Sequence, residues 1–119
     1  MKTEALKPTI LDLSLTYHWY DMIASGQKKE EYREIKPFYR SRMLLCKQKT
    51  FCIPYHCDET CAFLQFRKYD YVRFHRGQAG RETMLVRCDG ISIGKGKPEW
   101  GAHPADDVFI IKLGKIIMK

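Results

Sequence analysis

The segment Gly26–Arg33 joins two stretches of this sequence that have different periodicities. Apolar residues at helical spacing run up to Gly26, and an alternation typical of a strand follows over Lys29–Ile35. Glycine often ends a helix because it adopts the left-handed backbone conformation without steric cost. The sequence therefore predicts a helix, then a tight turn that carries Lys28, then a strand.

The strand after this turn is unusually charged. If it is extended, Glu31 and Arg33 share one face and Tyr32 points to the other. Together with Lys28 at the turn, the acid and the base form a compact charged cluster where a ligand can bind. The alternative is a solvated strand edge, on which each surface ion pair contributes about 0–1 kcal/mol. The spacing of these residues is compatible with both interpretations.

Four residues of this segment, Gly26, Lys28, Glu31 and Arg33, resemble the GxKxxExR signature of the ASCH domain, a PUA-like β-barrel family. The predicted order of a strand, a helix and then the signature turn is similar to that of the family. The resemblance implies a single domain over residues 1–119, with a variable insertion at about 46–68. Two later segments also resemble parts of the family. Asp70–Phe74 resembles the strand that follows the variable middle of the family, and Val108–Ile116 resembles its closing strand.

The hydrophobic pattern favours an α+β fold. It predicts about five or six strands and two helices, arranged as a mostly antiparallel, partly closed β-barrel with flanking helices, which is the PUA-like architecture that the resemblance implies. We expect Thr16 to cap the first helix, Trp19 and Ile23 to lie on its buried face, and Gly94–Lys97 to form a flexible basic loop. The expected elements are a strand Ile10–Leu15, a helix Tyr17–Ser25, a strand Lys29–Ile35, a helix from Pro37 to Leu45, and strands Tyr69–Arg76, Thr83–Cys88 and Val108–Ile116.

The chain is basic, with a formal net charge of +7 from 21 Lys and Arg residues against 14 Asp and Glu residues. Such a charge attracts polyanions such as nucleic acid, and it carries no information about the fold. No apolar segment resembles a signal peptide or approaches the ~20 residues that a membrane span needs. The sequence therefore predicts a cytoplasmic protein with no membrane partner.

Five cysteines, an odd number without a secretion signal, argue against a disulfide framework. Four of them lie between Cys46 and Cys61, so a zinc site built from His56, Cys57 and Cys61 is the alternative to free thiols. Their spacing is irregular for a structural zinc site, which usually offers paired ligands in both halves. We therefore expect the chain to fold without a metal and to use no cofactor.

The expected function is binding of RNA, of other single-stranded nucleic acid or of a modified nucleoside in a basic cleft of the barrel. RNA-binding proteins combine phosphate contacts with stacking of unpaired bases on aromatic or guanidinium planes. In this interpretation Lys28 contacts a phosphate or a base carbonyl. The planar guanidinium of Arg33 donates paired hydrogen bonds and also stacks on a base. Glu31 accepts hydrogen bonds from a base edge or fixes Arg33, and Trp100 either covers one end of the barrel or stacks on a base. The expected ligand-binding residues are Lys28, Glu31, Arg33, Tyr17, Arg40 and Trp100.

The resemblance also implies an enzymatic alternative. Some ASCH-domain proteins are small amidohydrolases that deacylate N4-acetylcytidine with the signature lysine, a hydroxyl residue at the position of the signature glutamate, and a downstream glutamate. Here Lys28 and Glu31 would be the catalytic residues, but the hydroxyl residue is absent. The downstream acid would be either Glu82 or Glu99. A third alternative is a protein-interaction module without a small ligand.

Overall fold

The computed structural model describes residues 7–46, 64–78 and 80–119. The chain divides into two compact units, which we call unit 1 and unit 2. Unit 1 comprises Met1–Lys29, Lys68–Gly90 and Lys112–Lys119, and unit 2 comprises Glu30–Arg67 and Ile91–Ile111. The single domain over residues 1–119 stays a prediction.

The fold is α+β, as the sequence predicts. Its larger sheet has five strands in the order β1-β5-β6-β7-β2 and is mostly antiparallel, and β3 and β4 form a separate antiparallel pair. None of the helices in the described ranges is both long and apolar enough to cross a membrane. In chain order the elements are β1 (Ile10–Leu15), α1 (Tyr17–Ala24), β2 (Glu30–Arg33), α2 (Pro37–Met43), β3 (Leu44–Cys46), β4 (Leu64–Phe66), β5 (Tyr71–Arg76), β6 (Thr83–Lys95), the 3-10 helix η2 (Pro98–Trp100) and β7 (Asp107–Met118).

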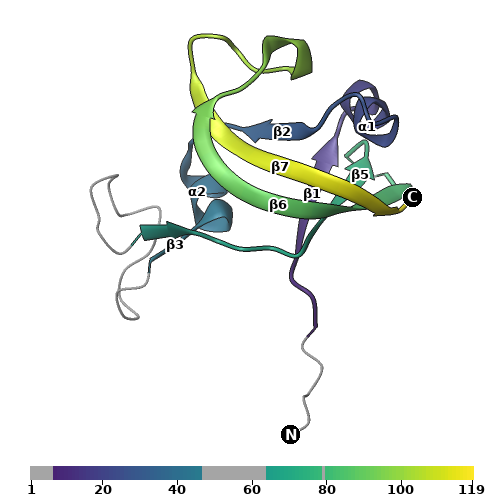
Figure 1. Ribbon diagram of the computed structural model, residues 1–119, viewed down its shortest axis with the longest axis horizontal. Coiled ribbons are helices and arrows are strands. Elements are labelled where there is room, and N and C mark those ends of the chain that lie inside the picture. The colour runs from purple at the N-terminus through teal and green to yellow at the C-terminus, as the bar shows by residue number, and fades with distance from the viewer. Residues whose placement is uncertain (1–6, 47–63, 79) are drawn as a thin grey trace, which may run out of the picture. The chain divides into compact units, whose positions relative to one another are not determined.

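Unit 1 is built on the pairing of β1 with β5. The two strands are parallel, with Ile10 opposite Tyr71 and Leu15 opposite Arg76, and β5 is antiparallel to the first part of β6. Side chains along a strand point alternately to opposite faces, so each strand buries every second residue. Helix α1 packs against β1 and β5 (Figure 1). The buried side chains of these elements are Leu11, Leu13, Leu15, Tyr20, Ile23, Val72, Phe74, Met84 and Val86.

The first helix ends at the predicted glycine. Gly26 has φ = 86°, in the left-handed region, and its N–H donates to the carbonyl of Ile23 over 3.0 Å. The N–H groups of Gln27 and Lys28 both donate to the carbonyl of Met22, each over 3.0 Å. This pattern is a Schellman motif with one additional hydrogen bond, and it satisfies carbonyls that a helix end leaves unpaired. The predicted turn that carries Lys28 is therefore confirmed.

Two details of α1 differ from the prediction. Thr16 occupies the N-cap position, but its side chain makes no capping hydrogen bond. Trp19 is only half-buried, whereas Tyr20 and Ile23 are buried. A helix of eight residues presents a narrow covered face, and the (i, i+3) pair Tyr20 and Ile23 fills it, which leaves Trp19 at the edge.

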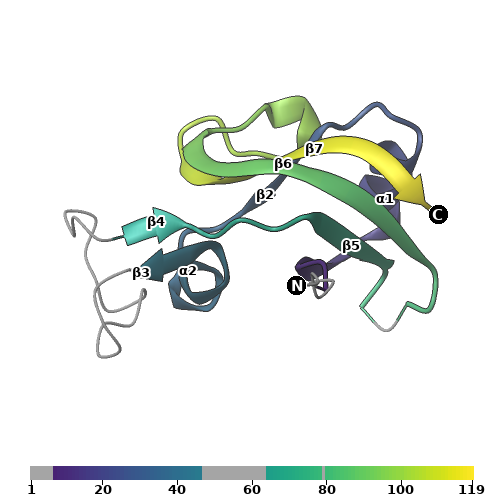
Figure 2. The ribbon, with the colours of Figure 1, turned by 60° about the horizontal axis from the view of Figure 1, so that its bottom comes forward.

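Unit 2 contains the signature strand and the second helix. Strand β2 covers Glu30–Arg33 and is shorter than the predicted Lys29–Ile35. Helix α2 begins at Pro37 as predicted, because a proline in the first turn removes an N–H that has no helical partner there. Strand β3 follows α2 directly, packs against it and pairs with β4 (Figure 2). The buried side chains of unit 2 include Met43, Leu44, Cys46, Ile91, Ala102, Val108, Phe109 and Ile111.

Most of the predicted insertion at about 46–68 lies outside the described residues. Its two described ends pair with each other in an antiparallel manner, with Cys46 opposite Leu64.

The prediction of a flexible loop at Gly94–Lys97 is wrong in part, since β6 includes its first half and Gly96 is closely packed. A Cβ atom on Gly96 would lie 2.7 Å from the Tyr32 ring and 2.7 Å from the Cβ atom of Ala102. The backbone N–H of Lys97 donates to the Tyr32 hydroxyl over 3.0 Å. Close packing against Tyr32 and Ala102 therefore explains the glycine at position 96.

Gly96→Ala should lower the free energy of unfolding by about 1–3 kcal/mol, the typical cost of overpacking a filled site. Gly94→Ala is the matched control, because a Cβ atom there would lie 3.5 Å from Cδ1 of Ile110, an ordinary van der Waals contact. Urea unfolding of both variants and the wild type measures the difference. Equal unfolding midpoints for the two variants would show that the space around Gly96 is not restrictive.

Candidate functional site

Lys28 is a buried lysine at the turn after α1, with only 4% of its surface exposed. Its ammonium nitrogen lies 4.8 Å from the centroid of the Trp19 ring. A cation held over an aromatic face is stabilised by about 0.5–2 kcal/mol, and the upper end of this range applies where water is excluded. The assignment of Trp19 to the core is therefore corrected: the half-buried ring provides an aromatic face for Lys28.

Lys28 also lines a small cavity within unit 1 of about 190 Å³. Two more lysines, Lys29 and Lys115, line the same cavity, and its apolar walls include Ile23 and Leu113. Cavities that enclose drug-sized ligands usually measure about 300–1,000 Å³. This cavity therefore suits one small anionic or carbonyl-bearing group rather than a large ligand.

Glu31, which is buried, and Arg33, which is half-buried, form an ion pair on one face of β2. Nε of Arg33 donates to Oε2 of Glu31 over 2.9 Å, and Nη2 of Arg33 lies 2.8 Å from the same oxygen. Their side chains are 14% and 6% exposed for Arg33 and Glu31, respectively. Nη1 of Arg33 donates to the Tyr39 hydroxyl over 3.0 Å, so α2 also holds the guanidinium. The shared face is confirmed, and the alternative of a solvated strand edge is wrong for this pair.

Lys28 belongs to unit 1, whereas Glu31 and Arg33 belong to unit 2. The cleft that these three residues were expected to share therefore stays a prediction. Each unit by itself supplies a fixed cation beside an aromatic side chain: Lys28 with Trp19 in unit 1, and Arg33 with Tyr39 in unit 2, where the guanidinium carbon lies 5.5 Å from the ring centroid.

Tyr17 lies at the start of α1 and is 61% exposed. The guanidinium carbon of Arg76 lies 4.2 Å from the centroid of its ring, and Arg76 is fixed by two hydrogen bonds to Asp21, each of 3.0 Å. Two residues along an α-helix correspond to a rotation of about 200°, so Tyr17 and Trp19 point to different sides of α1. Tyr17 is therefore a binding candidate separate from the Lys28–Trp19 contact.

Trp100 and Arg40 are both half-buried in unit 2. The ammonium of Lys97 lies 4.5 Å from the centroid of the Trp100 ring. The neighbouring Tyr32 hydroxyl donates to Oε1 of Glu30 over 2.7 Å, and burial is the main cause that raises the pKa of Tyr32. Trp100 is thus a further aromatic ring beneath a cation, and stacking on a base stays a prediction for it.

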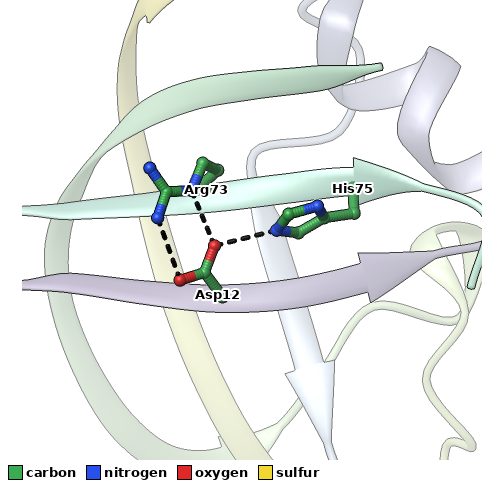
Figure 3. A network of polar contacts seen from close by, with 3 residues as sticks. All are labelled: Asp12, Arg73 and His75. Carbon is green, nitrogen blue, oxygen red and sulfur yellow. Dashed lines mark hydrogen bonds and ion pairs between the residues drawn. The ribbon is translucent and has the colours of Figure 1, made fainter. Parts of the chain in front are cut away.

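A polar network on β1 and β5 was missed by the sequence analysis. Oδ1 of Asp12 lies 2.7 Å from Nε of Arg73 and 2.8 Å from Nε2 of His75, and Nη2 of Arg73 donates to Oδ2 over 3.2 Å (Figure 3). The hydrogen bond from Arg73 is the largest cause that lowers the pKa of Asp12, and His75 adds to it. Alternation predicts that these side chains face outward, but no local signal pairs two strands whose residues are 61 positions apart.

The remaining candidates concern catalysis and metal binding. Glu82 lies 3.9 Å from Nε of Arg76 with its side chain 65% exposed, and Glu99 is exposed in η2. His56, Cys57 and Cys61, the ligands of the zinc alternative, lie outside the described residues. Within the described ranges, no group of three or more His, Cys, Asp or Glu residues is arranged to hold a metal ion.

Arg33→Ala should lower the free energy of unfolding by about 3–5 kcal/mol, because it removes the guanidinium from a buried carboxylate. Lys36→Ala is the matched control: Lys36 pairs with Glu34 over 3.0 Å, but the side chains are 52% and 76% exposed. Breaking such a surface pair should cost about 0–1 kcal/mol. Denaturant unfolding measures both values, and equal costs would show that burial of the Glu31–Arg33 pair has no energetic consequence.

The lowered pKa of Asp12 predicts a dependence of stability on acid. A carboxyl whose pKa is lower in the folded state stabilises the fold above its unfolded pKa of ~3.9, and this contribution is lost as the pH falls through the folded pKa. Asp12→Asn should therefore reduce the loss of unfolding free energy that accompanies acidification below pH ~4. The double variant Asp12→Asn with Arg73→Gln should behave like Asp12→Asn alone. Parallel pH profiles for Asp12→Asn and the wild type would contradict this role of the network.

Comparison of the chain with known protein families, with characterised proteins and with solved structures finds no match. The resemblance to ASCH domains therefore rests on the signature at Gly26–Arg33 and on the order of elements around it.

Proposed function

We propose that this protein binds single-stranded RNA through cations that lie over aromatic rings, on a PUA-like barrel of the ASCH type. Six cation–aromatic pairs, with the cation 3.9–5.7 Å from the ring centroid, occur among the described residues. These contacts are the observation that carries the proposal. The pairs are Lys28 with Trp19, Arg33 with Tyr39, Lys36 with Tyr39, Arg42 with Phe38, Arg76 with Tyr17, and Lys97 with Trp100.

A cation beside an aromatic ring offers the two contacts that single-stranded RNA makes with proteins. The charge attracts a phosphate, and the ring or the guanidinium plane stacks on an unpaired base. Arg76 with Tyr17 is a well-exposed example, since 61% of Tyr17 is accessible. The net charge of +7 adds a long-range attraction to the RNA backbone.

The cavity beside Lys28 supports recognition of one nucleotide group within this general binding. Its three lysines favour a phosphate or a base carbonyl, and its apolar walls limit competition by water. The same chemistry accommodates part of a modified nucleoside, which is the small-ligand form of the proposed function.

The amidohydrolase alternative has less support. The Glu31 carboxylate is bound by Arg33 in an ion pair, and the hydroxyl residue that the related hydrolases use in its place is absent. No observation among the described residues specifically favours the protein-interaction alternative.

Fluorescence anisotropy with a labelled oligouridine should detect binding that weakens as the salt concentration rises from ~50 to ~200 mM, because phosphate contacts release counterions. The logarithm of the binding constant should fall against the logarithm of salt concentration with a slope of about −0.7 for each phosphate contact. A duplex of the same length should bind more weakly, since its bases are not free to stack on side chains. Absence of binding at ~50 mM salt would contradict the proposed function.

Within the same experiment, Tyr17→Leu should weaken oligouridine binding by roughly 5- to 150-fold, which corresponds to the loss of one base stack. Tyr17→Phe is the matched control, because it keeps the ring beneath Arg76 and should bind like the wild type. If Tyr17→Leu binds as tightly as Tyr17→Phe, the Arg76–Tyr17 pair is not part of the RNA-binding surface.

A further inference from the structure

The sheet of unit 1 has one face that carries no buried side chain. Strand register places its residues in three rows across β1, β5 and β6, and every one of them is half-buried or exposed. On the opposite face the alternate residues of these strands form the core. We call the face without buried side chains the exposed face. Its three rows are Ile10–Tyr71–Arg87, Asp12–Arg73–Leu85 and Ser14–His75–Thr83.

The exposed face is centred on the Asp12 network (Figure 3). A carboxylate only accepts hydrogen bonds, so Nε2 of His75, which lies 2.8 Å from Oδ1 of Asp12, must carry a hydrogen. In the neutral imidazole the other ring nitrogen, Nδ1, is then an acceptor. Asp12 therefore fixes both the tautomer and the orientation of the His75 ring.

Asp12 fixes Arg73 in the same way and leaves part of its guanidinium available. The contacts of 2.7 and 3.2 Å to the carboxylate use Nε and one N–H of Nη2. The other guanidinium N–H groups remain as donors, and 41% of the side chain is exposed. Because both side chains contact one carboxylate oxygen, a donor for an anion and an acceptor for a hydroxyl lie side by side.

We propose that Arg73 and His75 form a ribonucleotide site on the exposed face, where Arg73 binds a backbone phosphate and Nδ1 of His75 accepts a hydrogen bond from the ribose 2′-hydroxyl. This inference rests on the proposed RNA-binding function and adds to it a means of distinguishing RNA from DNA, since the 2′-hydroxyl is the group that DNA lacks. Charge complementarity supports RNA as the occupant, because Arg87 adds a second cation to the same face. Tyr71, in the row of Arg87, adds an aromatic ring.

The test compares an oligouridine with the 2′-deoxy oligomer of the same sequence by fluorescence anisotropy at pH ~8. The wild type should bind the RNA about 3- to 10-fold more tightly than the DNA, the equivalent of one net hydrogen bond. His75→Phe keeps a planar ring without the acceptor and should bind both oligomers equally. Arg87→Gln is the matched control: it should weaken both oligomers by a similar factor and keep their ratio.

The outcomes separate this inference from the proposed function. An undiminished preference for RNA in His75→Phe, or no preference in the wild type, would overturn the ribonucleotide site while RNA binding itself stands. Absence of RNA binding by the wild type at ~50 mM salt would overturn the proposed function and the site with it. Thermal unfolding of His75→Phe should match the wild type, because the His75 side chain is 31% exposed and packs in no core.

Discussion

The parallel pairing of β1 with β5 is the constraint on which unit 1 depends. Hydrogen bonds fix its register at both ends: the N–H of Thr9 donates to the Asp70 carboxylate over 3.0 Å, and the N–H of Gly77 donates to the carbonyl of Leu15 over 2.7 Å. Because side chains alternate with a period of two, a slip by one residue would turn the apolar row of β1 to solvent and Asp12 into the core. The same register therefore fixes both the core and the charged network on the exposed face.

Both units contain an arginine that a carboxylate orients: Arg33 with Glu31, and Arg73 with Asp12. A guanidinium that is already oriented loses less conformational freedom when it binds a further group. The two pairs differ in what they contribute to the fold. Loss of one partner from the buried Glu31–Arg33 pair leaves an uncompensated charge, whereas the exposed pair adds little to stability and keeps donors accessible. The Glu31–Arg33 pair therefore contributes more to the stability of the fold, and the Asp12–Arg73 pair keeps more of its guanidinium accessible.

Local features of this fold could be predicted from the sequence, and long-range ones could not. The glycine that closes α1 at Gly26, the start of α2 at Pro37 and the shared face of Glu31 and Arg33 each depend on backbone conformation over a few residues. The Asp12 network depends instead on which strand β1 selects as its partner, a choice made by the whole core. The predicted cleft with Lys28 is of this second kind, because the signature fixes the spacing of its residues along the chain and not their separation in space.

The half-buried position of Trp19 and the burial of Lys28 have one physical cause. A lysine is seldom buried, because removal of its charge from water is costly unless another group compensates. At the end of α1 the backbone N–H of Lys28 donates a hydrogen bond to the carbonyl of Met22. This bond holds the backbone of Lys28 against the helix. The Trp19 ring, at the edge of the covered face of α1, lies 4.8 Å from the ammonium. Helical spacing alone predicts that Trp19 is buried like any apolar residue. The turn at Gly26 instead places the Lys28 ammonium over the Trp19 ring, and the ring partly compensates the buried charge.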